Sequence, residues 1–248
     1  MHMKLIIVDG YEEMSDAAAD IVASVIADKP SAALGLTTGN TPMGLYKRLC
    51  ARYREGRLPL QDIRVFSTEE YLGVPPDDRR SLYAWLKREL LEPCGIGQDR
   101  VFRMSGEDPE PQLACERFDR LLQTSGGMDL IVEGIGRNGH IGFNEPGSLP
   151  ATRSRIVALT NETLDHNYEY WSDAVPQYGM TIGMANILSA KRILLMASGS
   201  AKAESLLKAL HGPVTSAVPA SFLQEAGNLT VLADKEAAKL LVSSERQG

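Results

Sequence analysis

Residues 128–147 read MDLIVEGIGRNGHIGFNEPG, an apolar run that passes into a glycine-rich loop. The run up to residue 136 has the length and apolar character of a buried strand. Its glycines Gly134, Gly136 and Gly139 have the G-x-G-x-x-G spacing of a dinucleotide-binding turn. That motif needs a helix directly after it, because the pyrophosphate binds at the helix N-terminus. Here HIGFNEPGSLP follows, with two glycines and two prolines, which indicates an ordered loop. We therefore reject a nicotinamide-binding site.

Away from this segment, short apolar runs alternate with amphipathic stretches. We expect strands at 4–8, 32–36, 63–67, 128–136, 191–199 and 229–234, and helices at 14–28, from Pro42, at 81–91, 111–127 and 200–212, and in the C-terminal KEAAKLLVSS. This alternation predicts an α/β fold with a mostly parallel sheet covered on both faces. No repeat or linker divides the 248 residues, so we expect a single domain over 1–248.

Composition narrows the class of protein. The chain is 44% hydrophobic and 23% charged, with a net charge of −6, which argues against nucleic-acid and membrane-surface partners. A local basic pocket for a small anion stays open. Its three cysteines are widely spaced and form no CxxC pair, so we expect a reduced, cytoplasmic protein without a metal site. The N-terminal apolar run is too short for a signal peptide, and no run approaches a membrane span.

The loop after the central strand carries one histidine and one glutamate. His140 is flanked by glycines and lies five residues before Glu145. A histidine so placed can approach a substrate closely, and its ordinary pKa suits proton transfer near neutrality. Glu145 could orient the ring. The alternative is a surface histidine in a turn, and we favour the functional interpretation because the loop follows a strand end.

Two further segments are typical of anion binding. In LGLTTGNTPMGLYKRL (34–49), backbone amides and hydroxyls from Thr38 to Thr41 precede a helix, whose N-terminus attracts anions. The segment lacks the ending of a Walker loop, so a small phosphate ester fits better than ATP. In MASGSAKAESLLK (196–208), Lys202 opposes the helix dipole unless an anion is bound. The alternatives are a turn capped by Thr41 and a solvated lysine.

An acidic pair also follows a predicted strand. In VFSTEEYLGVPPDD (65–78), Glu69 or Glu70 could be a general base for a C–H proton. A solvated acidic turn is the alternative.

Together, these segments resemble the glucosamine-6-phosphate deaminase/isomerase family, in particular its shorter bacterial members. The resemblance covers almost the whole chain, in the order LGLTTGNTPMGLYKRL, FSTEEYLGVP, GIGRNGHIGFNEPGS, SRIVALTNET, VPQYGMTIGM and SGSAKA. The segment GHIGFNEPG is the most specific, since the related 6-phosphogluconolactonases continue differently after Gly-His. The resemblance implies a Rossmann-like three-layer α/β/α sandwich and no cofactor. It also implies that a 2-amino-2-deoxy-hexose 6-phosphate and water become a ketohexose 6-phosphate and ammonia.

The resemblance assigns roles to individual residues. His140 matches the histidine that opens the sugar ring, Glu145 its glutamate partner, and Asn138 a neighbouring position that is aspartate or asparagine in the family. Glu69 matches the base that moves the C2 proton. The expected substrate-binding residues are Thr38, Gly39, Asn40 and Thr41 in the phosphate loop, Lys202 as the phosphate lysine, and Glu70 and Gly136.

Two positions depart from the family's pattern. The family's base is usually an aspartate followed by glutamate, whereas this chain has Glu69-Glu70. The extra methylene moves the carboxylate, and small misplacements are costly in catalysis. An arginine that contacts the substrate's phosphate end in glucosamine-specific members aligns with Glu169. The sugar epimer, glucosamine or galactosamine, therefore stays open, as does a homo-oligomer.

Two other functions remain as alternatives. One is a related sugar-phosphate enzyme, such as a 6-phosphogluconolactonase-like lactonase or a simple aldose–ketose isomerase. The other is a non-catalytic sugar-phosphate sensor. Ammonia release separates the first from a deaminase, and binding without turnover identifies the second.

Overall fold

A seven-stranded sheet forms the centre of the computed structural model, which describes residues 3–171 and 175–245. Its order is β1 (Lys4–Val8), β10 (Leu229–Asp234), β9 (Ile193–Ala197), β6 (Leu130–Gly134), β2 (Ala33–Leu36), β3 (Arg64–Ser67) and β5 (Val101–Phe102). Every neighbouring pair is parallel. The carboxyl ends of all these strands therefore meet at one edge, and β6, which leads into the glycine-rich loop, lies at the centre.

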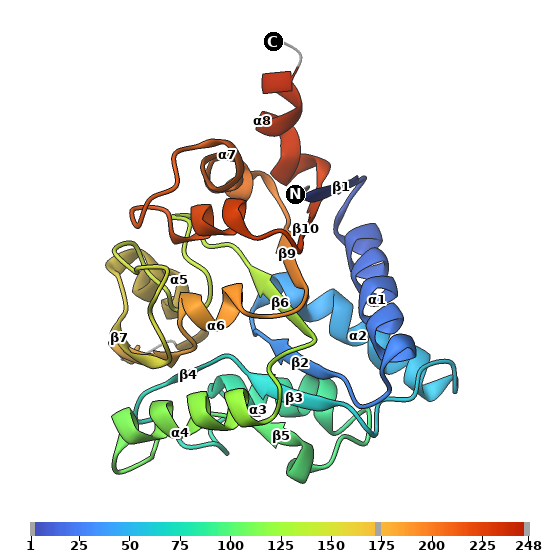
Figure 1. Cartoon of the computed structure of the whole chain (residues 1–248), viewed down its shortest axis with the longest axis vertical. Helices are drawn as coiled ribbons and strands as arrows, with labels where there is room; N and C mark the ends of the chain where they lie inside the picture. The colour runs from blue at the N-terminus through green and yellow to red at the C-terminus, as the bar shows by residue number, and fades with distance from the viewer. Residues whose placement is uncertain (1–2, 172–174, 246–248) are drawn as a thin grey trace.

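Helices cover both faces of this sheet (Figure 1). One face packs against α1 (Tyr11–Asp28), α2 (Asn40–Arg54), α3 (Leu82–Leu86) and the π-helical turn η1 (Lys87–Leu91). The other face packs against α4 (Pro111–Thr124), α6 (Met184–Leu188), α7 (Ala203–His211) and α8 (Lys235–Glu245). Alternate strand residues, such as Leu34 and Ala33, enter the two cores. This is the expected three-layer α/β/α arrangement.

A second, smaller sheet lies beside the carboxyl edge. It is antiparallel, in the order β4 (Glu69–Tyr71), β8 (Tyr178–Thr181) and β7 (Arg155–Ala158). The helix α5 (Asn161–Trp171) follows β7, and Figure 1 shows β7, α5 and α6 grouped at one side of the molecule. The amide of Ile182 donates to the carbonyl of Thr68, which ties this sheet to the end of β3.

The structure confirms the six predicted strands and corrects several helices. The helix predicted from Pro42 begins at Asn40 with Gly39 as its N-cap, so Thr41 is not the cap. The helix predicted over 81–91 is a short α3 followed by η1, and 200–212 begins as a 3-10 turn, η3 (Ser200–Lys202), before α7. The short strands β4, β5, β7 and β8 and the helices α5 and α6 were not predicted.

From the sequence we expect no segment that spans a membrane. Within 3–171 and 175–245, no helix combines the length and apolar character that a bilayer crossing requires.

Candidate active site

A cavity of about 1530 Å³ opens at the carboxyl edge of the central sheet. The turns after β2, β6 and β9 meet there with β4 and with α5. Its wall includes Thr37, Thr38, Gly39, Asn40, Thr41, Lys47, Glu69, Trp85, Gly136, Arg137, His140, Glu162, Thr163 and Lys202. The cavity thus brings together residues that are more than 150 positions apart in the sequence.

The turn between β2 and α2 forms one wall. Gly39 has φ +119°, a conformation that favours glycine, and it turns the chain so that α2 begins at Asn40. As N-cap, Gly39 has no side chain to accept from the first helical amides, and the first turn of α2 holds no acidic residue. The N-terminus of this 15-residue helix lines the cavity with Asn40 and Thr41, and is therefore suited to an anion.

Two cations, Lys202 and Arg137, line the same cavity as this helix end. Lys202 ends η3, just after Gly199 makes a second turn with positive φ. Burial lowers the pKa of the Lys202 ammonium, and the positive charge of Arg137 lowers it further, whereas Glu162 opposes the shift. Both cations line the cavity. Two like charges held together in a partly buried wall favour an anion between them.

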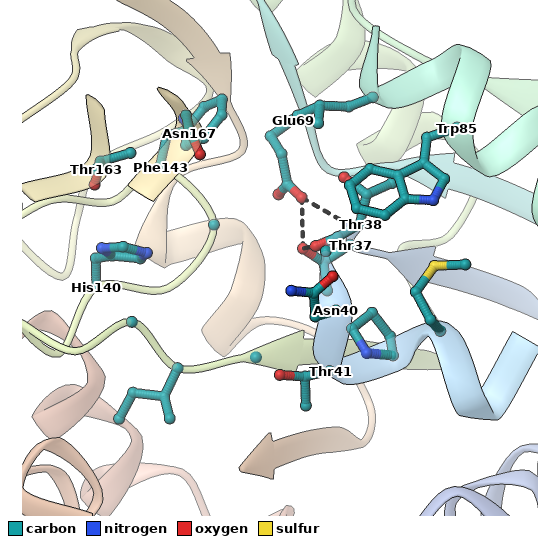
Figure 2. Close-up of a pocket in the computed structure, with 18 of the residues that line it drawn as sticks. Thr37, Thr38, Asn40, Thr41, Glu69, Trp85, His140, Phe143, Thr163 and Asn167 are labelled. Atoms are coloured by element: carbon teal, nitrogen blue, oxygen red, sulfur yellow. Dashed lines mark hydrogen bonds between the residues drawn. The ribbon is translucent and has the colours of Figure 1, made fainter. Parts of the chain in front are cut away.

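Glu69 is held beside the β2–α2 turn by hydroxyl and amide donors. Its Oε1 accepts from the Thr37 hydroxyl (2.5 Å) and the Thr38 amide (3.1 Å), and its Oε2 accepts from the Thr68 hydroxyl (2.8 Å). Burial raises the pKa of the Glu69 carboxyl, while these hydrogen bonds oppose the rise. The result is a buried carboxylate with a raised proton affinity, facing the cavity (Figure 2).

Glu70 does not reach the cavity wall, although we expected it to contact the substrate. Successive strand residues point to opposite faces, so Glu70 turns away from Glu69. Its carboxylate accepts from the Ser81 hydroxyl (2.6 Å) and from the amides of Tyr71, Leu82 and Tyr83. Glu70 therefore caps the N-terminus of α3, and the adjacent acids have different environments.

His140 faces the cavity from the loop after β6, opposite Glu69 (Figure 2). The Gly136 amide donates to the His140 carbonyl (2.9 Å), which folds the imidazole back over Gly136. A Cβ at Gly136 would lie only 2.3–2.5 Å from ring atoms of His140. Glycine is therefore required at this position by the close approach of the ring.

Glu145 and Asn138 support the histidine. Glu145 Oε2 lies 3.4 Å from His140 Nδ1, a close contact that is not a hydrogen bond. Asn138 donates to Glu145 Oε2 (3.1 Å) and accepts from the His140 amide (3.0 Å). Burial raises the pKa of Glu145, but the interactions with His140 and Thr163 outweigh it and lower the pKa to about 2. An ionised glutamate therefore stands beside the imidazole.

Several contributors to this site were missed in the sequence. Thr37 and Thr68 hold Glu69, Thr163 donates to Glu145 Oε1 (2.5 Å), and Arg137 adds a cation. Arg137 lies between Gly136 and Asn138, so its place in the loop was a usable signal. Nothing local marks Thr163, since α5 brings it to Glu145 from a separate element.

Two further predictions from the sequence concern Glu169 and the absence of a metal site. The side chain of Glu169, expected near the phosphate end, lies outside the described part of the structure. Among the described residues, no group of three or more His, Cys, Asp or Glu side chains could hold a metal ion.

The family described as glucosamine-6-phosphate isomerases/6-phosphogluconolactonase matches residues 9–232. A glucosamine-6-phosphate deaminase of Bacillus velezensis is 41% identical over 238 residues, covering 95% of this chain and 99% of its own. The chain belongs to this family. A second relative, glucosamine-6-phosphate deaminase 2 of Bacillus subtilis, is 37% identical and covers 98% of this chain and 99% of its own.

Solved structures of the family agree with the fold. A monomeric glucosamine-6-phosphate deaminase superposes with a TM-score of 0.94 at 39% identity, covering 96% of this chain and all of its own. A 6-phosphogluconolactonase from Trypanosoma brucei superposes with a TM-score of 0.80 at 20% identity, covering 97% of this chain and 99% of its own. The second match supports the fold alone.

Proposed function

We infer that the chain is a deaminase that converts glucosamine 6-phosphate and water into fructose 6-phosphate and ammonia. The relatives reported above are named for this activity at about 40% identity over nearly the whole chain. They are named for glucosamine, which favours it over the galactosamine epimer. The whole chain, 1–248, is proposed to act as one sugar-phosphate domain.

The observation that carries the mechanism is the arrangement of the cavity wall. A carboxylate, Glu69, and an imidazole, His140, face one another across a single cavity (Figure 2). The same cavity has two cations, Lys202 and Arg137, and the N-terminus of α2. A sugar phosphate has its phosphate at one end and its C1 and C2 at the other, so the wall matches both ends of such a molecule.

The substrate phosphate is proposed to bind where the positive groups converge. Apart from the Thr38 amide, which donates to Glu69, the Thr38–Thr41 turn offers amides and hydroxyls, and Lys202 and Arg137 offer charge-assisted hydrogen bonds. Binding would relieve the mutual repulsion of the two cations. The phosphate then fixes the register of the sugar against Glu69 and His140.

His140 is proposed to open the ring. It takes the proton from the O1 hydroxyl and delivers one to the ring oxygen, so that C1 becomes an aldehyde. The ionised Glu145 beside Nδ1 stabilises the imidazolium that forms in between. Asn138 holds the backbone of His140 and the carboxylate of Glu145 in one hydrogen-bonded unit.

Glu69 is proposed to move the C2 proton. Its Oε1 has two donors from the β2–α2 turn, whereas Oε2 has one, so Oε2 is the oxygen with room for a proton. Glu69 removes the C2 proton while a proton of the substrate's ammonium group passes to O1, which gives an enolamine. Return of the C2 proton to C1 then gives an imine at C2. Water adds to this imine, and the C2–N bond breaks to release ammonia and leave the ketone.

The raised proton affinity of Glu69 suits both halves of this transfer. A general base works best when its pKa approaches the working pH, because it must accept a proton and then return it. Burial moves the pKa of the Glu69 carboxyl in this direction, and the three donors keep the ionised form available.

The test is exchange of the C2 hydrogen. In deuterated water, wild-type protein should release ammonia from glucosamine 6-phosphate and place deuterium at C2 of unreacted substrate or at C1 of the product. Glu69→Gln keeps the shape of the side chain and removes the base, so exchange and ammonia release should fall by roughly 10²–10⁴-fold. Binding of the phosphorylated sugar should persist.

Glu162→Gln is the matched control, because Glu162 also lines the cavity but is assigned no proton transfer. It should retain exchange. Equal losses in both variants would remove Glu69 from its role. Wild-type protein that binds hexosamine 6-phosphates without exchange or ammonia release would favour the sensor alternative instead.

We further propose that one chain suffices for activity. Each residue assigned above comes from the same chain, and the solved relative of 39% identity is described as monomeric. Light scattering should then give a mass near 27.0 kDa. A larger mass together with loss of activity on dilution would support a homo-oligomer.

A further inference from the structure

Two thiols from separate elements meet in the core behind the cavity wall. Cys50 belongs to α2, and Cys94 follows η1, 44 positions later. Their sulfur atoms lie 2.9 Å apart, and the side chains are 3% and 0% exposed. Cys115 belongs to the core on the opposite face of the sheet. The wide spacing of the cysteines in sequence gave no sign of this pair.

The pair joins two segments that line the cavity. Beyond Asn40 and Thr41, α2 contributes Met43 and Lys47 to the wall, and the segment before Cys94 contributes Trp85. Figure 2 shows Trp85 beside the Thr37–Thr38 turn. The chain between the two cysteines also contains β4 with Glu69. A covalent bond here would close a loop around the segment that carries the proposed base.

We propose that Cys50 and Cys94 are a redox-sensitive pair that forms an intramolecular disulfide when the protein meets hydrogen peroxide. A disulfide needs its sulfur atoms about 2.05 Å apart, so the two sulfurs must approach by less than about 1 Å. Disulfides that form in reducing compartments are usually transient or redox-sensing.

The chemistry assigns the order of events. A hydrogen bond with Cys94 lowers the pKa of the Cys50 thiol, and the positive charge of Arg54 adds to this effect, whereas burial and the charge of Glu89 oppose it. The same hydrogen bond, together with burial, raises the pKa of Cys94. The Cys50 thiolate attacks the peroxide to give a sulfenic acid and hydroxide. Cys94 then attacks the Cys50 sulfur, and the sulfenic oxygen leaves as water, so two thiols and one peroxide yield one disulfide and two waters.

The disulfide should stabilise the protein because it constrains the unfolded chain. In a chain of this size, the bond should raise the melting temperature by roughly 5–10 °C. The proposal rests on packing and thiol chemistry, so its outcome does not depend on the proposed deaminase activity.

The test treats the native full-length protein with hydrogen peroxide, followed by alkylation and peptide mapping without reductant. A Cys50–Cys94 linked peptide pair, lacking two hydrogens, should appear while Cys115 stays alkylated. The melting temperature should rise, and dithiothreitol should reverse both changes.

Cys115→Ser is the matched control and should form the same bond. Cys50→Ser and Cys94→Ser should show neither the linked peptide nor the rise in melting temperature. The proposal fails if all three thiols stay free under conditions that oxidise glutathione, or if the bond formed involves Cys115. Because the mapping of wild-type protein needs no variant, a folding defect in either serine variant leaves the result decisive.

Discussion

At the scale of single residues, the histidine loop shows how little space the proposed chemistry leaves. The imidazole of His140 lies directly against the Cα of Gly136, which lacks a side chain. The motif's glycine spacing, which first suggested a nucleotide site, thus serves a different purpose. It lets the ring fold back toward the cavity and toward Glu145.

We predict that Gly136→Ala lowers kcat by roughly 10–100-fold, because a methyl group would displace the imidazole and small misplacements are costly. Steady-state ammonia release measures the effect. Gly134→Ala is the control, since a Cβ there meets nothing closer than Thr41 Cβ at 3.9 Å. Equal activity of the two variants would contradict a tight constraint on the ring.

A second residue of interest is Glu133, which is 1% exposed near the carboxyl end of β6. Among the described residues, neither of its carboxyl oxygens has a hydrogen-bond partner. Burial raises the pKa of the Glu133 carboxyl well above its usual range, and the charge of Glu69 raises it further. Tyr46, whose own pKa is raised by burial and by both glutamates, is a further titratable neighbour.

We predict that Glu133→Leu stabilises the protein by about 1–3 kcal/mol at neutral pH, because an unpartnered buried polar group is removed. The folded state holds a proton that the unfolded chain releases above its ordinary pKa of about 4.3. The free-energy cost of keeping this carboxyl protonated in the folded state is therefore absent below that pH. It grows as the pH rises toward the raised pKa of the folded state.

Urea unfolding of both proteins at pH 5 and pH 8 measures this difference. The gap between variant and wild type should widen at the higher pH. A gap that stays constant would mean that Glu133 titrates as an ordinary glutamate.

At the scale of elements, neighbouring strand residues have opposite tasks. Glu69 and Glu70 are indistinguishable as an acidic pair in the sequence, and only the strand β4 separates them. Its alternation directs Glu69 to the cavity and Glu70 to the N-terminus of α3. Because β4 has only three residues, its period could not be read from the sequence.

The same argument explains which elements were predictable. Strands buried on both faces, such as β2 and β9, are short apolar runs and were found. The strand β7 is half-exposed, and β8 begins at an exposed tyrosine, so neither has a strong apolar signal. Their pairing with β4 depends on contacts between distant segments, which local patterns do not encode.

We predict that Glu70→Ala destabilises the protein by roughly 2–4 kcal/mol, because it removes an acceptor from a buried helix cap and leaves several donors unpaired. The loss should also raise KM for the substrate, since α3 carries Trp85 to the cavity wall. Urea unfolding and ammonia-release kinetics measure the two effects. Ser81→Ala removes one donor to Glu70 and the acceptor of the Ala84 amide, but it leaves the amides of Leu82 and Tyr83 paired with Glu70. It should therefore cost less, and an equal cost would contradict a central role for Glu70.

At the scale of the whole molecule, the proposed site lies where separate parts of the chain converge. The β2–α2 turn, β4, the loop after β6 and η3 all contribute to one wall. A ligand held by these segments stabilises the folded chain, because the unfolded chain does not have the site. The family resemblance pointed to most of the wall residues from the sequence alone. The threonine hydroxyls that hold Glu69 and Glu145 could be identified only from the structure.

We predict that fructose 6-phosphate raises the melting temperature of the protein, whereas fructose does not. This product is a suitable probe, because without ammonia it cannot react in reverse. At a concentration 100-fold above its dissociation constant, a ligand contributes about 2.7 kcal/mol, which corresponds to roughly 5–10 °C for a chain of this length.

Lys202→Ala should lose most of this shift, because it removes one of the two cations proposed to bind the phosphate. The matched control is Lys208→Ala. Lys208 lies on the adjacent helix α7, where it pairs with Glu204, and its side chain is 57% exposed. Both variants lose one positive charge from the same region, so a general electrostatic effect would reduce the shift equally. A shift that survives in Lys202→Ala would instead place the phosphate away from this wall, and the register of the sugar against Glu69 and His140 would then be wrong as well.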